Sequence, residues 1–212
     1  MISMQFAMKV QVTHMEKSIN SIQIDALKEL INIGGGNAAT SISEIIDEPV
    51  NMRVPVIDIM DYEELYSTVM AEDKPVYAVM NQVYGDAGGI FLFSLTHEVV
   101  KTMTAMMLPK DIEVTSELEQ SAIIELENIV VNSFLMALSK EINYNMLSSV
   151  PQLTIDMFGS IISSLYMEMG QFDEQLLIIK NEFLYLGDKI DASLYFIPYE
   201  GTLEKIFKSM GV

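Results

Sequence analysis

The chain has 212 residues, half of them hydrophobic, and a formal net charge of −18 at neutral pH. This length lies between one large domain and two small ones, and the apolar content is sufficient for a sizeable core. Only 12 residues are Lys or Arg, which argues against nucleic-acid binding and against attraction to an anionic membrane surface.

The residue types that most often carry catalysis or bind metals are scarce. Cysteine is absent, which excludes disulfides, thiol catalysis and cysteine-based zinc sites. His14 and His97 are the only histidines, so neither a Ser-His-Asp triad nor a His-rich metal site is expected. We therefore expect no metal or cofactor of the protein's own, and any chemistry must use carboxylates, amides, hydroxyls or a partner's groups.

The sequence lacks the patterns of membrane and secreted proteins. It contains no run of about 20 apolar residues, and its start has no basic lead followed by a long apolar stretch. A soluble, cytoplasmic protein without membrane insertion is expected. Residues 1–17 alternate loosely, which fits an edge strand, a docking arm or a disordered extension, and we favour the disordered extension.

The first half of the chain predicts a series of six elements. Apolar residues at intervals of three and four indicate the helices, alternation and β-branched residues indicate the strands, and proline or glycine marks their ends. The elements are a helix from about residue 18 to Pro49, a strand at 50–59, a short helix at 61–70, hairpin strands at 75–84 and 89–95, and a helix at 96–108.

The second half predicts the same order of elements. After a linker at 110–115, Ser116 and Glu119 have the spacing of a capping box, which places the start of a second long helix at Ser116. The elements are this helix to about Leu138, a strand at 145–158, a short helix at 159–169, hairpin strands at 174–186 and 190–197, and a terminal helix at 201–210.

Matched residues connect the two halves. An offset of 96 carries Pro55 to Pro151 in the first predicted strand of each half, and an offset of 102 carries the turn residue Gly85 to Gly187. The change of offset indicates a six-residue insertion in the second half. Agreement of several features in the same order favours an internal repeat.

These elements predict an α+β fold. We expect one internally duplicated, pseudo-twofold domain over residues 18–212, with repeats at about 18–109 and 116–212. Its sheet is expected to be largely antiparallel, with about six strands, and the two long helices are expected to pack on it.

A polar stripe recurs on each long helix. Each stripe has a polar residue, a glutamate and an asparagine at positions i, i+4 and i+7, which share one side of a helix, and the opposite side is apolar. The residues are Asp25, Glu29 and Asn32 in the first helix and Ser121, Glu125 and Asn128 in the second. One such stripe is usually a solvated face, but two copies at the same helical phase favour a working surface.

The pairing of glutamate with asparagine suits positioning better than proton transfer. Asparagine is no general base, but its carbonyl accepts a hydrogen bond from water while its amide group donates one. Orientation of water in this way serves phosphoryl hydrolysis, where positioning carries much of the rate. The glutamate one turn away suits docking on a basic group. The pair therefore fits a substrate protein that brings its own metal and electrophile.

Three consecutive glycines, Gly34, Gly35 and Gly36, follow the first asparagine. In an exposed helix each glycine costs roughly 1 kcal/mol, so something is expected to approach the backbone there. Either another helix or strand packs closely on it, or a partner protein approaches next to Asn32. A phosphate-binding loop is the weakest alternative, because neither a G-x-G-x-x-G nor a G-K-[ST] pattern is present.

The block Asp25-x-x-x-Glu29-x-x-Asn32-Ile-Gly-Gly-Gly-Asn37-Ala-Ala-Thr, with the later Ser121-x-x-x-Glu125-x-x-Asn128, resembles the CheC family of chemotaxis phosphatases, which is related to CheX and to the FliY middle domain. The resemblance covers the chain from about Ser18 to its end. It implies hydrolysis of the aspartyl phosphate of a CheY-type response regulator in bacterial chemotaxis.

The resemblance also implies roles for individual residues. Asn32 and Asn128 would position the attacking water, Glu29 and Glu125 would contact a regulator lysine, and the regulator would hold Mg²⁺. Asp25 and Ser121 would support the stripes, and Gly34, Gly35 and Gly36 are candidates for partner approach. The receptor deamidase CheD is implied as a second partner.

Two other functions remain open at this stage. One is a non-catalytic CheY- or CheD-binding module or flagellar-switch-like adaptor. FliM-type middle domains share the expected architecture but lack the paired motif, which argues for the enzyme. The other is an acidic dimerising scaffold, since the 17 methionines also suit adaptable packing. Because both glutamate–asparagine pairs are intact, the motif does not rank the two sites.

Overall fold

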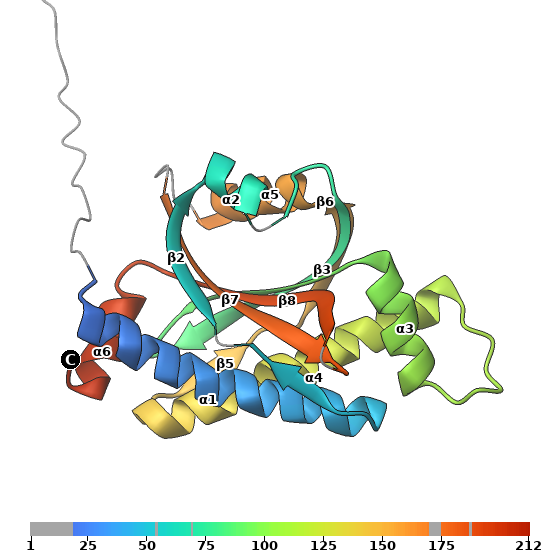
Figure 1. The fold of residues 1–212 in the computed structure, drawn as a ribbon. Helices are drawn as coiled ribbons and strands as arrows, with labels where there is room; N and C mark the ends of the chain where they lie inside the picture. Colours follow the sequence, from blue (N-terminus) through green and yellow to red (C-terminus); the bar gives the residue numbers. More distant parts are fainter. Residues whose placement is uncertain (1–18, 54, 69, 170–174, 187) are drawn as a thin grey trace, which may run out of the picture.

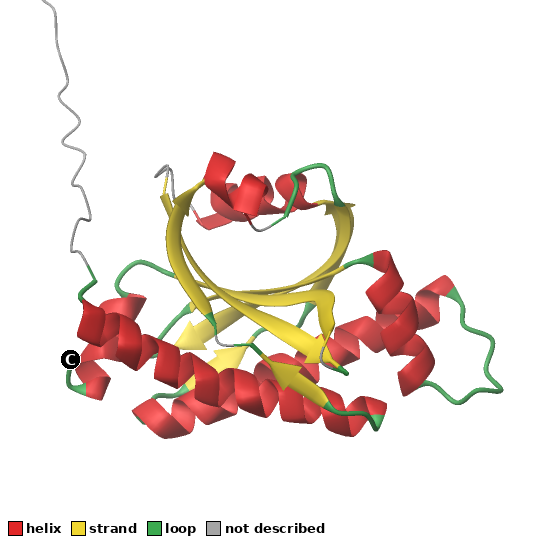
Figure 2. Cartoon of the chain, viewed as in Figure 1, coloured by secondary structure: helices red, strands yellow, loops and turns green. Residues whose placement is uncertain are grey.

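The computed structural model describes residues 19–53, 55–68, 70–169, 175–186 and 188–212. The expected N-terminal extension at residues 1–17 lies outside these ranges. The described chain forms three layers (Figures 1 and 2). Two long helices cover one face of a curled antiparallel sheet, and two short helices lie on the other face.

The helices and strands follow the predicted order. The first half contains α1 (Ser21–Ile46), β1 (Val50–Met52), β2 (Val56–Asp61), α2 (Tyr62–Thr68), β3 (Pro75–Gly85), β4 (Gly89–Leu95) and α3 (His97–Met107). The second half contains α4 (Ser116–Ile142), β5 (Met146–Ser148), β6 (Gln152–Met157), α5 (Phe158–Met169), β7 (Gln175–Tyr185), β8 (Asp188–Pro198) and α6 (Thr202–Met210). The order of elements is the same in the two halves, while their origin by duplication stays a prediction.

The sheet has eight strands in the described residues, more than the expected six. The difference arises because the segments 50–59 and 145–158, each expected as one strand, are both divided in two. Pro55 and Pro151 directly precede β2 and β6. Proline has no amide hydrogen to donate to a neighbouring strand and restricts the residue before it, so the pairing is interrupted at both positions.

The strand pairing ties the two halves together. The sheet order is β1-β7-β8-β4-β3-β5, with β2 also paired to β7 and β6 also paired to β3. Strands β1 and β2 of the first half therefore pair with the second half, and β5 and β6 of the second half pair with the first. Strands β4 and β8 meet in the middle, with Leu92 opposite Tyr195. Each half supplies an edge of the other half's sheet.

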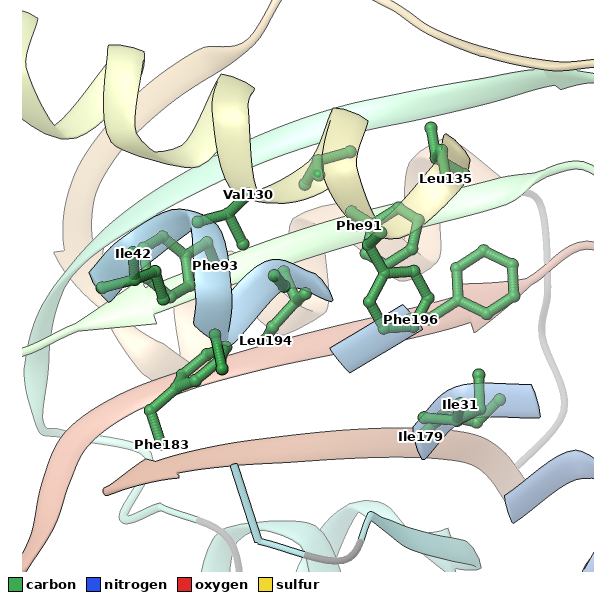
Figure 3. Packing of buried hydrophobic residues seen from close by; sticks show 14 of the residues in the cluster. Ile31, Ile42, Phe91, Phe93, Val130, Leu135, Ile179, Phe183, Leu194 and Phe196 are labelled. Atoms are coloured by element: carbon green, nitrogen blue, oxygen red, sulfur yellow. The ribbon is translucent and has the colours of Figure 1, made fainter. Parts of the chain in front are cut away.

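Two hydrophobic cores lie on opposite faces of the sheet. The larger core is buried between α1, α4 and the sheet, and it includes the rings of Phe91 and Phe196, which are tilted by 33° with their centroids 4.9 Å apart (Figure 3). The smaller core joins the sheet to α2 and α5 through Leu65 and Phe158. Burial of each large apolar side chain contributes about 1.5–3 kcal/mol, so the larger core fixes α1 and α4 on the sheet.

The ends of α1 and α4 are defined by capping residues. At the start of α4, Thr115 accepts a hydrogen bond from the Leu118 amide at 3.2 Å. Thr115 is therefore the N-cap, and the predicted cap at Ser116 is wrong by one residue, because both side chains suit the position. Asp47 and Asn143 end the two helices in the left-handed conformation, each with φ of 54°. The expected end of α4 near Leu138 is therefore one turn too early.

α4 is the one helix in the described ranges whose length and apolar composition would allow it to cross a membrane. Half of its most apolar stretch is buried inside the fold. Its buried residues, among them Ile123, Val130 and Phe134, belong to the larger core. Since a core helix of a soluble protein has the same composition, the packing accounts for the apolar character of α4.

Candidate functional site: two polar stripes on α1 and α4

The two predicted stripes lie on the outer sides of α1 and α4. In both helices the polar residue and the glutamate are exposed and the asparagine is half-buried; these residues are Asp25, Glu29 and Asn32 on α1, and Ser121, Glu125 and Asn128 on α4. The orientation follows from the apolar residues between them. Leu30 of α1 and Leu126 of α4 are fully buried in the core, which turns the opposite side of each helix to solvent.

The stripes form two separate sites. α1 and α4 lie side by side and run in opposite directions (Figure 1), and Ser41 donates a hydrogen bond to Ser133 across the pair, with 2.7 Å between the hydroxyl oxygens. Asn32 and Asn128 both precede these serines in sequence, so they are displaced towards opposite ends of the helix pair. At 1.5 Å of rise per residue, they are separated by roughly 20 Å along the helices. A small partner can therefore engage one asparagine without covering the other.

The two asparagines have different surroundings. The Asn128 side chain accepts a hydrogen bond from Asn132, with 2.9 Å between Oδ1 and Nδ2. Asn132 in turn accepts a hydrogen bond from the Ser148 hydroxyl at 3.1 Å. At the position of α1 that matches Asn132 the chain has Gly36, and the Asn32 side chain makes no hydrogen bond to any other residue that the structure describes. Among the described residues, therefore, Asn128 is held by a neighbouring side chain and Asn32 is not.

The three glycines of α1 separate into two packed positions and one open position. A Cβ atom on Gly34 would lie 2.9 Å from the Phe134 ring, and one on Gly35 would lie 1.9 Å from the Met52 sulfur. Both glycines are buried, so close packing accounts for them, and partner approach at these two positions stays an untested prediction. A Cβ atom on Gly36 would meet nothing within 4 Å. Partner approach stays a prediction for Gly36, which is exposed.

The predicted site residues did not include a buried carboxyl group that lies next to the second stripe. Glu127 lies between Glu125 and Asn128 in sequence, but its side chain is 0% exposed. Neither carboxylate oxygen has a hydrogen-bond partner in the described part of the chain, and burial raises the pKa of Glu127 to about 8. The repeat indicates that the Glu127 side chain is buried, because the residue at the matching position of α1 is the buried Ile31.

The described residues contain no group of three or more His, Asp or Glu side chains that could hold a metal ion. The stripes present isolated carboxylates and amides at the surface. These groups can dock on a partner's cation and orient a water molecule. Whether a partner brings Mg²⁺ to them stays a prediction.

Comparisons with known proteins agree with the resemblance noted in the motifs. The model of the CheC-like family matches residues 22–59, which include the first stripe. The chain is 28% identical over 200 residues to the CheY-P phosphatase CheC of Bacillus subtilis (strain 168), and the match covers 91% of this chain and 96% of that protein.

Solved structures share the fold at lower identity. The solved structure of FliY from Thermotoga maritima is 18% identical with a TM-score of 0.71, and the match covers 92% of this chain and 98% of the chain in that structure. The FliM middle domain from H. pylori is 10% identical with a TM-score of 0.59, over 91% of this chain and 100% of that domain. These likenesses show the fold. The family model and the B. subtilis relative show that the chain is similar in sequence to CheC-like proteins.

Proposed function

We propose that this protein hydrolyses the aspartyl phosphate of a CheY-type response regulator in bacterial chemotaxis signalling. Asn32 and Asn128 orient the attacking water, and Glu29 and Glu125 dock on a basic group of the regulator. Water adds to the phosphorus atom, and the bond between phosphorus and the aspartyl oxygen breaks. The products are inorganic phosphate and a free aspartate. The regulator holds the Mg²⁺ ion, and this chain contributes no cofactor.

One observation carries this proposal. A glutamate and an asparagine occupy the same exposed stripe on both long helices, in a chain that is similar along nearly its whole length to a CheY-P phosphatase. A neutral amide beside a docking carboxylate can position a water molecule, but these two groups supply neither a general base nor a metal ion. The chemistry is therefore complete only when a phosphorylated partner supplies the electrophile and its metal.

A second candidate function is a non-catalytic adaptor that binds CheY or CheD. The observation in its favour is the FliM middle domain, which adopts the same fold. The fold alone therefore does not imply hydrolysis. An adaptor would bind the regulator with 1:1 stoichiometry and leave its phosphate in place, whereas a phosphatase would remove the phosphate from many regulator molecules in succession. CheD remains a proposed second partner. We also propose a cytoplasmic location, and the absence of cysteine agrees with it.

The decisive experiment follows the loss of phosphate from a phosphorylated CheY-type regulator. The wild type is expected to accelerate this loss, and the double variant Asn32→Ala/Asn128→Ala is expected to reduce it to the regulator's own rate. Removal of a water-positioning group typically costs 10²-fold or more in rate. Glu44→Gln serves as the control, since Glu44 is exposed near the end of α1, more than three turns beyond Asn32.

Binding of the regulator, measured in parallel, separates the two candidate functions. Retained binding with lost hydrolysis in the double variant supports the catalytic assignment. Hydrolysis that survives in a folded double variant contradicts the assignment of the two asparagines. Binding without any turnover by the wild type favours the adaptor.

A further inference from the structure

The side chain of Asn132 makes three hydrogen bonds around the second candidate site. Its Nδ2 atom lies 2.7 Å from the backbone oxygen of Asn128 and 2.9 Å from Oδ1 of the same residue. Its Oδ1 atom accepts a hydrogen bond from the Ser148 hydroxyl at 3.1 Å. Ser148 belongs to β5, so this chain of bonds connects the α4 stripe to an edge of the sheet.

This arrangement fixes the orientation of both amides. A backbone carbonyl only accepts, so the Asn132 atom beside the Asn128 carbonyl must be the NH₂ group. The same NH₂ group contacts the Asn128 side chain, and the atom it meets there must be an acceptor, which is Oδ1. The NH₂ group of Asn128 is consequently directed away from Asn132. One lone pair of its Oδ1 is used, and the second remains available to a water molecule.

The first site has none of these bonds. Gly36 has no side chain to reach Asn32, and the residue that matches Ser148 is Met52, which carries no hydroxyl. Asn32 has no hydrogen-bond partner among the described residues, so its amide has to be oriented when the partner binds. A group that is ordered before binding loses less conformational freedom in the reaction.

We propose that Asn132, held by Ser148, is a positioning residue for Asn128, and that it makes the Glu125/Asn128 site the faster of the two. This inference rests on the proposed phosphatase function for its kinetic consequence. The structural part, that Asn132 orders the Asn128 amide, is independent of that function and is measurable without a partner.

The kinetic test uses proteins with one working site. In the Asn32→Ala background, which keeps only the Glu125/Asn128 site, addition of Asn132→Ala is expected to lower kcat roughly threefold to tenfold. The reason is that a released asparagine samples several rotamers of which only one is productive. The KM for the phosphorylated regulator is expected to stay unchanged, because docking by Glu125 is not altered. Ser148→Ala is expected to act in the same direction with a smaller effect.

A matched control is provided by Asn37, whose Nδ2 donates to the backbone oxygen of Ile33 at 2.8 Å. This is the same contact that Asn132 makes with the backbone, but without a bond to another side chain. Asn37→Ala in the Asn32→Ala background is expected to leave kcat unchanged. If it lowers kcat as much as Asn132→Ala does, the effect is one of helix stability and the proposal is wrong.

Side-chain NMR relaxation tests the structural part. The Asn128 amide is expected to be as ordered as rigid backbone, with S² near 0.85, and the Asn32 amide to fall below about 0.6. Asn132→Ala is expected to make Asn128 as mobile as Asn32. Equal order for the two asparagines in the wild type, or no change in the variant, overturns the proposal. A wild type without phosphatase activity would refute the proposed function, and the NMR comparison would still decide whether Asn132 positions Asn128.

Discussion

α1 and α4 present a glutamate and an asparagine at the same helical phase but differ in what surrounds the asparagine. One turn after the asparagine, α1 has Gly36 where α4 has Asn132, and one residue before it, α1 has Ile31 where α4 has Glu127. The first difference changes how firmly the asparagine is held. The second places next to the second site a buried carboxyl group that has no hydrogen-bond partner among the described residues.

The same motif on two helices therefore does not give two sites with the same surroundings. Exposure and helical phase are conferred by the apolar residues on the opposite side, which are similar in the two helices. Order and local stability come from neighbours such as Phe134, Met52 and Ser148, which differ in type from the residues at the matching positions of the other half. The Asn32 side chain has no hydrogen bond to another described residue, whereas the Asn128 side chain is held by Asn132, which is itself bonded to Ser148.

The largest effect is expected from Glu127, whose pKa is raised to about 8 by burial. Between its ordinary value of 4.5 and about 8, the folded protein keeps a proton that the unfolded chain has released. The contribution of protonated Glu127 to the free energy of unfolding is therefore fully present below pH 4.5 and is lost as the pH rises through 8. Relative to Glu127→Gln, the wild type should lose about 1.4 kcal/mol of unfolding free energy per pH unit across this window.

Chemical denaturation at a series of pH values measures this dependence. Glu127→Ile, which gives α4 the residue found at the matching position of α1, is the second neutral variant. Both variants should show the same difference in slope from the wild type, whatever their absolute stability. Parallel curves for the wild type and both variants would mean that Glu127 is ionised in the folded state.

A smaller effect is expected from Gly34, which is packed against the Phe134 ring of α4. A Cβ atom would lie 2.9 Å from the ring, closer than carbon atoms pack. The ring belongs to the larger core and is fully buried, so it has little room to move. Gly34→Ala is expected to lower the unfolding free energy by about 1–3 kcal/mol, the usual cost of overpacking.

Thermal or urea unfolding of Gly34→Ala checks this expectation. The matching position in α4 already has a side chain, Val130, so Val130→Ala provides a comparison in which a side chain is shortened. Both variants should be destabilised, Gly34→Ala by overpacking and Val130→Ala by a cavity. A Gly34→Ala protein at least as stable as the wild type would show that α1 and α4 can move apart at this point.

The fold could be predicted from the sequence to a large extent because its local signals are strong. Proline and glycine mark the ends of most elements, and the apolar spacing of the two long helices identifies which side is buried. The same spacing predicted that Glu29 and Glu125 would be exposed, which the structure confirms. The stripe positions were therefore accessible to local reasoning.

The neighbours of the stripes could not be predicted in this way. The crossed pairing of β1 with β7 and of β5 with β3 joins segments far apart in sequence, and no local pattern specifies it. The contacts of Gly34 with Phe134 and of Asn132 with Ser148 depend on that arrangement. These contacts show that Gly34 is closely packed, and they distinguish the surroundings of Asn128 from those of Asn32.

The smallest effect is expected from Gly36, the open glycine of α1. Its Cβ position is empty to 4 Å and its backbone is helical, so Gly36→Ala should raise the unfolding free energy by about 0.5–1 kcal/mol through reduced entropy of the unfolded chain. Urea unfolding of Gly36→Ala and Gly34→Ala side by side measures the contrast, because the same substitution two residues earlier should lower the unfolding free energy rather than raise it.

Gly36→Ala also tests partner approach beside Asn32. In the Asn128→Ala background, which keeps only the α1 site, an added methyl group is expected to raise the KM for the phosphorylated regulator about twofold to fivefold while kcat changes little, because it obstructs docking and leaves Asn32 unaltered. In the Asn32→Ala background the same substitution should have no effect on KM. A more stable protein with unchanged KM in both backgrounds would mean that the partner does not approach the backbone at Gly36. This glycine would then, unlike Gly34 and Gly35, not be required by any close contact.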